Sequence, residues 1–213
     1  MNGQEILIGS LIGALLGLLI TEHYERIWKR PTFKIEVGDI ADGRTHRFLH
    51  VNVTNVERTG IRKLLRSNNA SELIKARIVF YDPLTRSELC NFIGRWSSKA
   101  EPLDDVDYST GTGRPNFAMA QEAEHEIILP GETKPLTISI KFNGNKSFYG
   151  FNNWSYFKEW KDPQLEIDLK SVVVKFELYT TKFKRVAYFA LNNPSNNCNN
   201  FTLSPLTSNP LKD

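Results

Sequence analysis

Short segments rich in β-branched and aromatic residues recur along this chain from residue 33 onward, and turn residues separate them. In residues 48–53, Leu49, Val51 and Val53 alternate with polar residues and therefore share one face of a strand. No long stretch with helical periodicity competes with this pattern, so the sequence predicts an all-β fold. The predicted strands are residues 33–37, 48–53, 76–81, 126–129, 136–142, 172–179 and 186–191, with residues 89–96 as a weaker eighth.

The order of these segments favours a two-sheet antiparallel β-sandwich of about seven or eight strands, because strands and helices do not alternate. A barrel built from the same strands is the alternative. Two short helical inserts are expected, one within residues 61–75 and one within residues 152–160. Asn152 or Asn153 is expected to cap the second insert.

An uncharged apolar run of fifteen residues occupies positions 6–20. As a helix it is about 22 Å long, but residues 4–29 as one helix reach about 39 Å, enough to span a bilayer with tilt. No lysine or arginine precedes the run and no small-residue cleavage site follows it, which disfavours a cleaved signal peptide. The sequence therefore predicts one N-terminal transmembrane helix, with a cleaved signal or a soluble or interfacial helix as alternatives.

Residues at the carboxyl end of this helix suit a membrane interface. Tyr24 and Trp28 are four residues apart and share a face at the depth of an aromatic belt. Arg26, Lys29 and Arg30 are expected to contact anionic lipid headgroups.

Charge also predicts the orientation of the helix. Positive residues follow the apolar run and none precedes it, so the amino terminus is expected outside and the main domain in the cytoplasm. Five Asn-x-Ser/Thr glycosylation acceptors favour the opposite orientation, although a chain rich in asparagine produces such sequences by chance. These acceptors are Asn52, Asn69, Asn145, Asn153 and Asn200.

Glycines recur every four residues in the predicted anchor, at Gly9, Gly13 and Gly17, with Ser10 and Ala14 alongside. Small residues at this spacing let two helix backbones approach closely in lipid. We therefore expect self-association or pairing with another membrane helix, although glycine is also common in unpaired membrane helices.

The sequence contains no recognisable motif for a catalytic, metal-binding or nucleic-acid-binding site. A formal net charge of +3 does not indicate nucleic acid, and two cysteines do not make a disulfide framework or a four-thiolate zinc site. The four histidines lack metal-binding spacing, and no catalytic or phosphate-binding motif is present. The sequence therefore predicts no catalytic residues, no metal, no cofactor and no nucleic-acid partner.

Aromatic residues are dense between positions 148 and 160. We expect them to close one end of the core, with a binding groove or a membrane-docking surface as alternatives. Cys90 is expected in the core and Cys198 as an exposed thiol in the tail. His50 falls on the polar face of its strand and is expected to be exposed.

Two polar segments are expected to lack regular structure. Residues 192–213 are rich in Asn, Pro and Ser and show no periodicity, so they predict a disordered tail. Residues 101–116 are acidic and contain glycines and prolines, so they predict a mobile loop.

One family shares the order of these features. A membrane helix and a short linker precede a strand of sequence HVNVTN at residues 50–55, an apolar strand ending at Trp96, a PGET turn at residues 130–133 and a closing hairpin. In this the chain resembles prokaryotic membrane-tethered, immunoglobulin-like β-sandwich proteins. The resemblance implies an immunoglobulin-like fold and brings no catalytic residues with it.

Together these features predict three regions: a transmembrane helix and its extension in residues 1–30, a β-sandwich in residues 31–191, and a tail in residues 192–213. We expect a membrane-anchored, non-catalytic binding module that tethers a protein partner at the lipid surface. The alternatives are a structural subunit of an oligomeric membrane complex and an enzyme whose site is dispersed among the sandwich loops.

Overall fold

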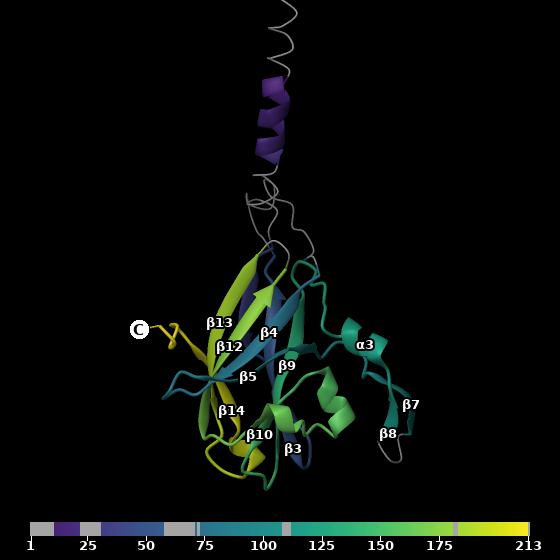
Figure 1. The fold of residues 1–213 in the computed structure, drawn as a ribbon, viewed down its shortest axis with the longest axis vertical. Coiled ribbons are helices and arrows are strands. Elements are labelled where there is room, and N and C mark those ends of the chain that lie inside the picture. The colour runs from purple at the N-terminus through teal and green to yellow at the C-terminus, as the bar shows by residue number, and fades with distance from the viewer. Residues whose placement is uncertain are drawn as a thin grey trace, which may run out of the picture.

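The computed structural model describes residues 11–21, 31–57, 71, 73–107, 112–180 and 183–212. Its body consists of two antiparallel sheets and a separate hairpin (Figure 1). The larger, sheet I, has the order β1-β3-β9-β10-β11, with β2 beside β3 and β6 beside β9. Its strands are β1 (Phe33–Val37), β2 (Ala41–Asp42), β3 (His46–Asn55), β6 (Arg95–Trp96), β9 (Thr133–Phe142), β10 (Phe148–Gly150) and β11 (Glu166–Ile167).

The smaller sheet, sheet II, has the order β14-β13-β12-β4-β5, and the hairpin β7-β8 stands apart at one side of the body (Figure 1). The strands of sheet II are β4 (Lys75–Tyr81), β5 (Glu88–Ile93), β12 (Ser171–Tyr179), β13 (Lys184–Asn192) and β14 (Thr202–Leu206). The hairpin consists of β7 (Leu103–Asp107) and β8 (Thr112–Pro115).

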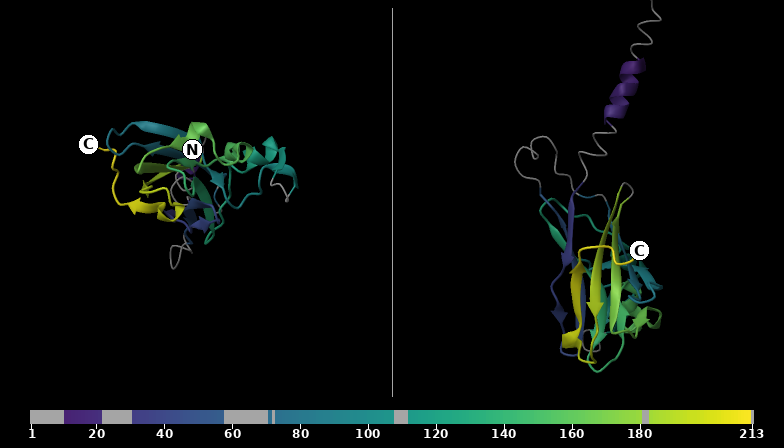
Figure 2. Two further views of the ribbon diagram at one scale, coloured as in Figure 1. Left: turned by 90° about the horizontal axis from the view of Figure 1, so that it is seen from below. Right: turned by 90° about the vertical axis from the view of Figure 1, so that its left-hand side faces the viewer.

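Alternation of side chains produces the core between the sheets. In β3, Leu49, Val51 and Val53 are buried and their neighbours are not. In β4, Ala76 and Ile78 are fully buried against them from the other sheet. The long strands of both sheets follow the long axis of the body (Figure 2). The expectation of an all-β chain with antiparallel sheets around one core is therefore confirmed.

Gly94 is the single residue between β5 of sheet II and β6 of sheet I, so the chain changes sheets there. A Cβ atom at this position would lie 2.5 Å from Cδ1 of Ile78 and 2.7 Å from Cδ2 of Leu136. One of these neighbours belongs to each sheet, so any larger residue at position 94 displaces the ends of two buried core side chains.

Short helices complete the body. The insert expected within residues 152–160 is present as η1 (Asn153–Lys158), and Asn152 caps it as predicted. Residues 61–70 of the other expected insert lie outside the described residues. The remaining helices of the body are α3 (Phe117–Glu122), η2 (Pro163–Leu165) and η3 (Cys198–Asn200).

Two local predictions are wrong. Residues 126–129 do not form a strand: within the described residues their only β-type pairing is an isolated bridge between Ile74 and Glu126, although Ile128 is buried in the core. The segment expected to be a mobile loop forms the hairpin β7-β8, in which Arg114 pairs with Asp105 at 2.7 Å.

The prediction of a disordered tail is also wrong for most of residues 192–213. Strand β14 pairs with β13 and forms an edge of sheet II. Phe201 is completely buried and packs against Phe148, with 5.1 Å between ring centroids. Cys198 is buried as well, so it is not the exposed thiol expected from the sequence.

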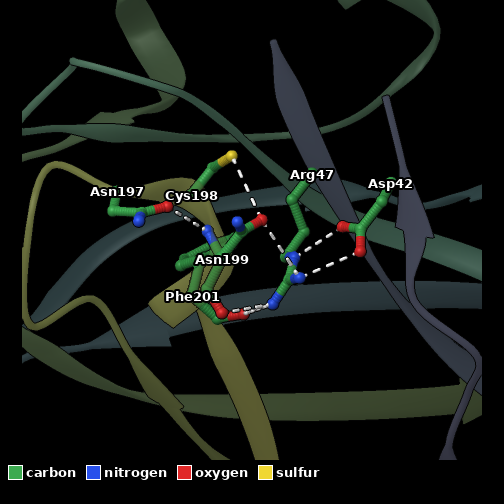
Figure 3. A network of polar contacts seen from close by, with 6 residues as sticks. All are labelled: Asp42, Arg47, Asn197, Cys198, Asn199 and Phe201. Carbon is green, nitrogen blue, oxygen red and sulfur yellow. Dashed lines mark hydrogen bonds and ion pairs between the residues drawn. The ribbon is translucent and has the colours of Figure 1, made fainter. Parts of the chain in front are cut away.

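A buried arginine connects this C-terminal segment to sheet I (Figure 3). Arg47 binds both carboxylate oxygens of Asp42, at 2.6 and 2.9 Å. It also donates to the carbonyl oxygens of Asn199 and Phe201, at 2.6 and 3.4 Å. The guanidinium group therefore holds η3 and the start of β14 against β3.

Near the amino terminus, residues 11–21 are helical and exposed. In the part of the chain that the structure describes, no helix has the length and apolar character needed to cross a membrane. A Cβ atom at Gly13 or Gly17 would contact nothing within 4 Å. The other residues assigned to helix pairing and to the interface lie outside the described residues: Gly9, Tyr24, Arg26, Trp28, Lys29 and Arg30.

Candidate functional site

A second aromatic layer covers the outer face of sheet I. Its centre is a small apolar cluster separate from the main core, formed by Ile140, Tyr149 and Phe151. Partly buried aromatic residues from β3, β9 and the segment after β10 pack on this centre. They are Phe48, Phe142, Tyr156 and Trp160.

The helix η1 brings the last two of these rings onto the sheet. Asn152 and Ser155 form a reciprocal capping box that fixes the start of η1. Asn153 is buried and its amide nitrogen donates to the carbonyl oxygen of Ala120 at 2.5 Å, which joins η1 to α3. The orientation of η1 is therefore determined by polar contacts at its start.

The two residues after η1 have an unusual backbone. Glu159 and Trp160 have φ angles of 50° and 64°, in the left-handed region that residues with a side chain rarely adopt. A hydrogen bond of 2.7 Å from the Trp160 amide to the Ser155 carbonyl holds this turn. Backbone strain of this kind costs roughly 1–3 kcal/mol per residue and tends to occur at functional sites.

This turn forms one wall of a pocket of about 300 Å³. We call it the aromatic pocket, and its lining residues are Glu101, Leu103, Tyr156, Glu159 and Trp160. The Tyr156 and Trp160 rings lie 6.5 Å apart at 85° to each other and form a corner of two aromatic surfaces. The volume of the aromatic pocket is at the lower end of the range for small-ligand sites.

Arg95 supports the pocket from the protein side. Its guanidinium carbon lies 4.8 Å from the centre of the Tyr156 ring, and only 3 % of the residue is exposed. It donates to the carbonyl oxygens of Trp96 and Lys99, at 3.0 and 2.9 Å, and to that of Ala100. Burial raises the pKa of the Tyr156 hydroxyl, so this ring stays neutral at physiological pH.

Three further aromatic residues, from α3 and η1, form a patch that we call the aromatic trio: Phe117, Trp154 and Phe157. Their ring centroids lie between 5.7 and 5.8 Å apart. Phe117 is 57 % exposed and Trp154 is 49 % exposed. Contiguous aromatic surface of this kind is typical of interaction sites.

A smaller polar cluster lies on the same face of sheet I, where sequence analysis expected an exposed His50. The imidazole is half-buried, and its Nδ1 lies 3.1 Å from the Thr137 hydroxyl and 3.4 Å from the Ser97 hydroxyl. Within the described residues no carboxylate hydrogen-bonds to the imidazole, so this cluster lacks the third member of a catalytic triad.

The burial of His50 predicts acid sensitivity. Burial lowers the pKa of His50 below its ordinary value of 6.5, and Asp39 opposes this only in part. As the pH falls below about 6.5, the unfolded state therefore takes up the proton first and the folded state loses stability. Urea unfolding at pH 7.5 and pH 5.5 should show this loss in the wild type and a smaller loss in His50→Gln.

The control for this prediction is His125→Gln, which removes a histidine from a different part of the fold. It should retain the loss of stability that the wild type shows between pH 7.5 and pH 5.5. If the His50→Gln and His125→Gln variants show the same pH dependence, the burial of His50 does not cause the acid sensitivity.

The structure brings together two segments that the sequence singled out. The aromatic-rich residues 148–160 share the pocket with Glu101 and Leu103 of the acidic segment 101–116. Glu101 was assigned to a mobile loop, and nothing in its local sequence indicated that it faces Trp160. Cys90 is partly buried, and burial raises its pKa to about 12, consistent with a core cysteine. In the described residues no three potential ligands are grouped to hold a metal ion.

Comparison with models of protein families, with curated proteins and with solved structures gave no match to this chain. The candidate site therefore depends on its own geometry.

The strained turn gives a second prediction. Glu159→Gly should stabilise the fold by about 0.5–1 kcal/mol, because glycine adopts the left-handed conformation without steric cost. Chemical denaturation measures this change. Glu122→Gly, at the last residue of the right-handed helix α3, relieves no such strain and should not stabilise the fold. Destabilisation by both substitutions would show that the turn at Glu159 carries no strain.

Proposed function

We propose that this protein is a non-catalytic binding module, built as an immunoglobulin-like β-sandwich and held at a membrane by its N-terminal helix. The aromatic pocket is the ligand-binding site in this proposal. The observation that carries it is the strained turn at Glu159 and Trp160, which places an aromatic ring and a carboxylate in one solvent-accessible pocket. The aromatic trio supplies further contact area for a protein partner.

The composition of the N-terminal helix supports the membrane anchor. All seven large apolar side chains between residues 11 and 20 are more than half exposed. An apolar surface of this extent requires an apolar environment, and the flanking sequence extends the apolar run to residue 6. Deletion of residues 1–30 should move the protein from the membrane fraction to the soluble fraction, and an unchanged membrane fraction would contradict the anchor.

The proposed orientation places the β-sandwich in the cytoplasm, in agreement with the charge distribution around the apolar run. One sequence argument for the opposite orientation weakens, because Asn153 is buried and its amide is bonded. Leu84 is 91 % exposed, so the variant Leu84→Cys carries an accessible thiol that reports on which side of the membrane the β-sandwich lies. The two native thiols, Cys90 and Cys198, are partly or fully buried. An impermeant maleimide should label this variant only after cell lysis; labelling in intact cells would reverse the orientation.

Partner capture tests the binding site. Full-length protein in mild detergent should retain a partner that Trp160→Ala loses and that Leu84→Ala retains. Both variants remove a large side chain, but Leu84 lies in the exposed β4–β5 turn, away from the pocket. If Trp160→Ala captures the same proteins as the wild type, the pocket is not the binding site.

The exposed aromatic trio also favours the second candidate, a structural subunit of a membrane complex. In that case the contact surface is permanently covered in the assembled complex. Trp154→Ala should then lower the mass of the solubilised complex, whereas a binding module should keep its mass.

A further inference from the structure

We infer that the aromatic pocket selects a positively charged organic ammonium group, either a quaternary ammonium of the choline type or the side chain of a lysine. This inference rests on the proposed function, since it names the ligand chemistry of the same site. It follows from three properties of the pocket: the faces of its rings, its free carboxylates and the fixed position of the nearest cation.

The rings supply the first property. Tyr156 and Trp160 are nearly perpendicular, so a ligand in the corner between them contacts two aromatic rings. The faces of aromatic rings carry negative electrostatic potential and attract cations, most strongly for tryptophan. The Arg95 guanidinium occupies the protein side of Tyr156, so a ligand reaches the corner from the side of the pocket.

Free carboxylates supply the second property. Among the described residues neither Glu101 nor Glu159 forms an ion pair, although Lys158 and Lys161 lie on either side of Glu159 in the sequence. The ammonium of Lys158 turns away to Asp162 at 2.7 Å. That of Lys161 lies 4.6 Å from the centre of the Phe142 ring. Both lysines are therefore engaged elsewhere, and the carboxylate of Glu159 remains available to a ligand.

The third property is that Arg95 does not neutralise the pocket. The two terminal nitrogens of its guanidinium group donate to three backbone carbonyl oxygens, and burial fixes the group beneath Tyr156. The lining of the pocket itself carries two carboxylates and no cationic side chain, because Arg95 lies beneath Tyr156 and Lys161 lies over Phe142. An anionic ligand is therefore repelled, and a neutral sugar that stacks on the rings leaves the carboxylates without a counter-charge.

The test uses the full chain in nanodiscs of phosphatidylglycerol, whose headgroup carries no ammonium. Isothermal titration calorimetry compares choline with 3,3-dimethylbutan-1-ol, which has the same shape without the charge. A lysine-containing peptide and glucose are the further probes. We expect choline or the peptide to bind at least about tenfold more tightly than the neutral alcohol, and binding to weaken with salt. The tighter of the two identifies the source of the ammonium group.

Isosteric substitutions locate the binding. Glu101→Gln and Glu159→Gln should each weaken ammonium binding by about three- to tenfold, and both residues are exposed, so neither change threatens folding. Glu122→Gln removes an exposed carboxylate on α3 and is the matched control. Equal affinities for choline and the neutral alcohol, or binding of glucose alone, would overturn the inference.

The two proposals fail differently. If Trp160→Ala loses a partner but no ammonium probe binds to the protein, the ammonium specificity is refuted. The proposal of a binding module then still stands. Ammonium binding that Glu122→Gln weakens as much as Glu159→Gln refutes the assignment to this pocket. If the chain binds no ammonium probe and Trp160→Ala retains every partner, both the inference and the proposed site are wrong.

Discussion

Replacing Phe201 by alanine should lower the free energy of unfolding by about 3–5 kcal/mol. The Phe201 side chain is fully buried, and its ring packs 5.1 Å from the ring of Phe148, which is itself fully buried in the core. Alanine leaves a cavity between these two segments, because the surrounding strands of both sheets cannot close over it. Equilibrium unfolding in urea measures the loss.

The control for this prediction is Phe117→Ala, because Phe117 is 57 % exposed. It should cost less than about 1 kcal/mol. If the two alanine variants are equally stable, the C-terminal segment does not belong to the core and the earlier expectation of a loose tail is correct after all.

Arg47→Met should cost about 2–3 kcal/mol, the second-largest effect that we expect. Methionine preserves the apolar stem of the side chain but cannot donate to the carbonyl oxygens of Asn199 and Phe201. The carbonyl oxygen of Phe201 loses its donor in a buried position, which costs about 1–3 kcal/mol, whereas the half-exposed Asp42 can return to water. The amides of β14 should also lose protection from hydrogen exchange.

Arg114→Met provides the comparison, since Arg114 also pairs with an aspartate but is 82 % exposed. Exposed ion pairs contribute about 0–1 kcal/mol, so this variant should be nearly as stable as the wild type. A similar loss in both variants would mean that the contacts to the C-terminal segment add nothing to the ion pair.

The long strands were accessible from sequence because burial of alternate side chains leaves a pattern of period two. Residues 33–37 and 172–179 were predicted with the bounds of β1 and nearly those of β12. The strands that were missed are mostly two to five residues long, such as β2 and β11. So few residues carry no periodic signal, and their pairing depends on a partner strand that is distant in sequence.

The sequence predicts disorder in the C-terminal segment because its Asn, Pro and Ser residues are typical of turns. Asn197 accepts a hydrogen bond of 2.8 Å from the amide of Asn199, the local contact for which asparagine favours turns. Two apolar residues nearby, Phe201 and Leu203, pack in or against the core. The average composition of a segment does not reveal a few apolar residues that pack on a core. A polar composition alone therefore does not predict disorder here.

The candidate site was predictable in part. Aromatic density identified the η1 segment, and Asn152 identified its cap. The left-handed backbone of Glu159 and Trp160 was not predictable, because neither residue type favours that conformation. The position of Glu101 in the same pocket as Trp160 was not predictable either. It depends on the position of the β7-β8 hairpin, which is set by tertiary contacts.

The pairing of β1 with β3 has a mechanical consequence for a tethered protein. β1 is the first strand after the N-terminal segment that we propose as the anchor, and all five of its residues pair with β3, from Phe33 opposite Asn55 to Val37 opposite Val51. The His46 end of β3, against which Trp160 packs, is about 30 Å farther along the strand. If the protein is tethered as proposed, tension between lipid and ligand acts along β1. It then loads the perpendicular hydrogen bonds between β1 and β3 in shear, all at once, and this geometry resists pulling better than one in which the bonds break one at a time.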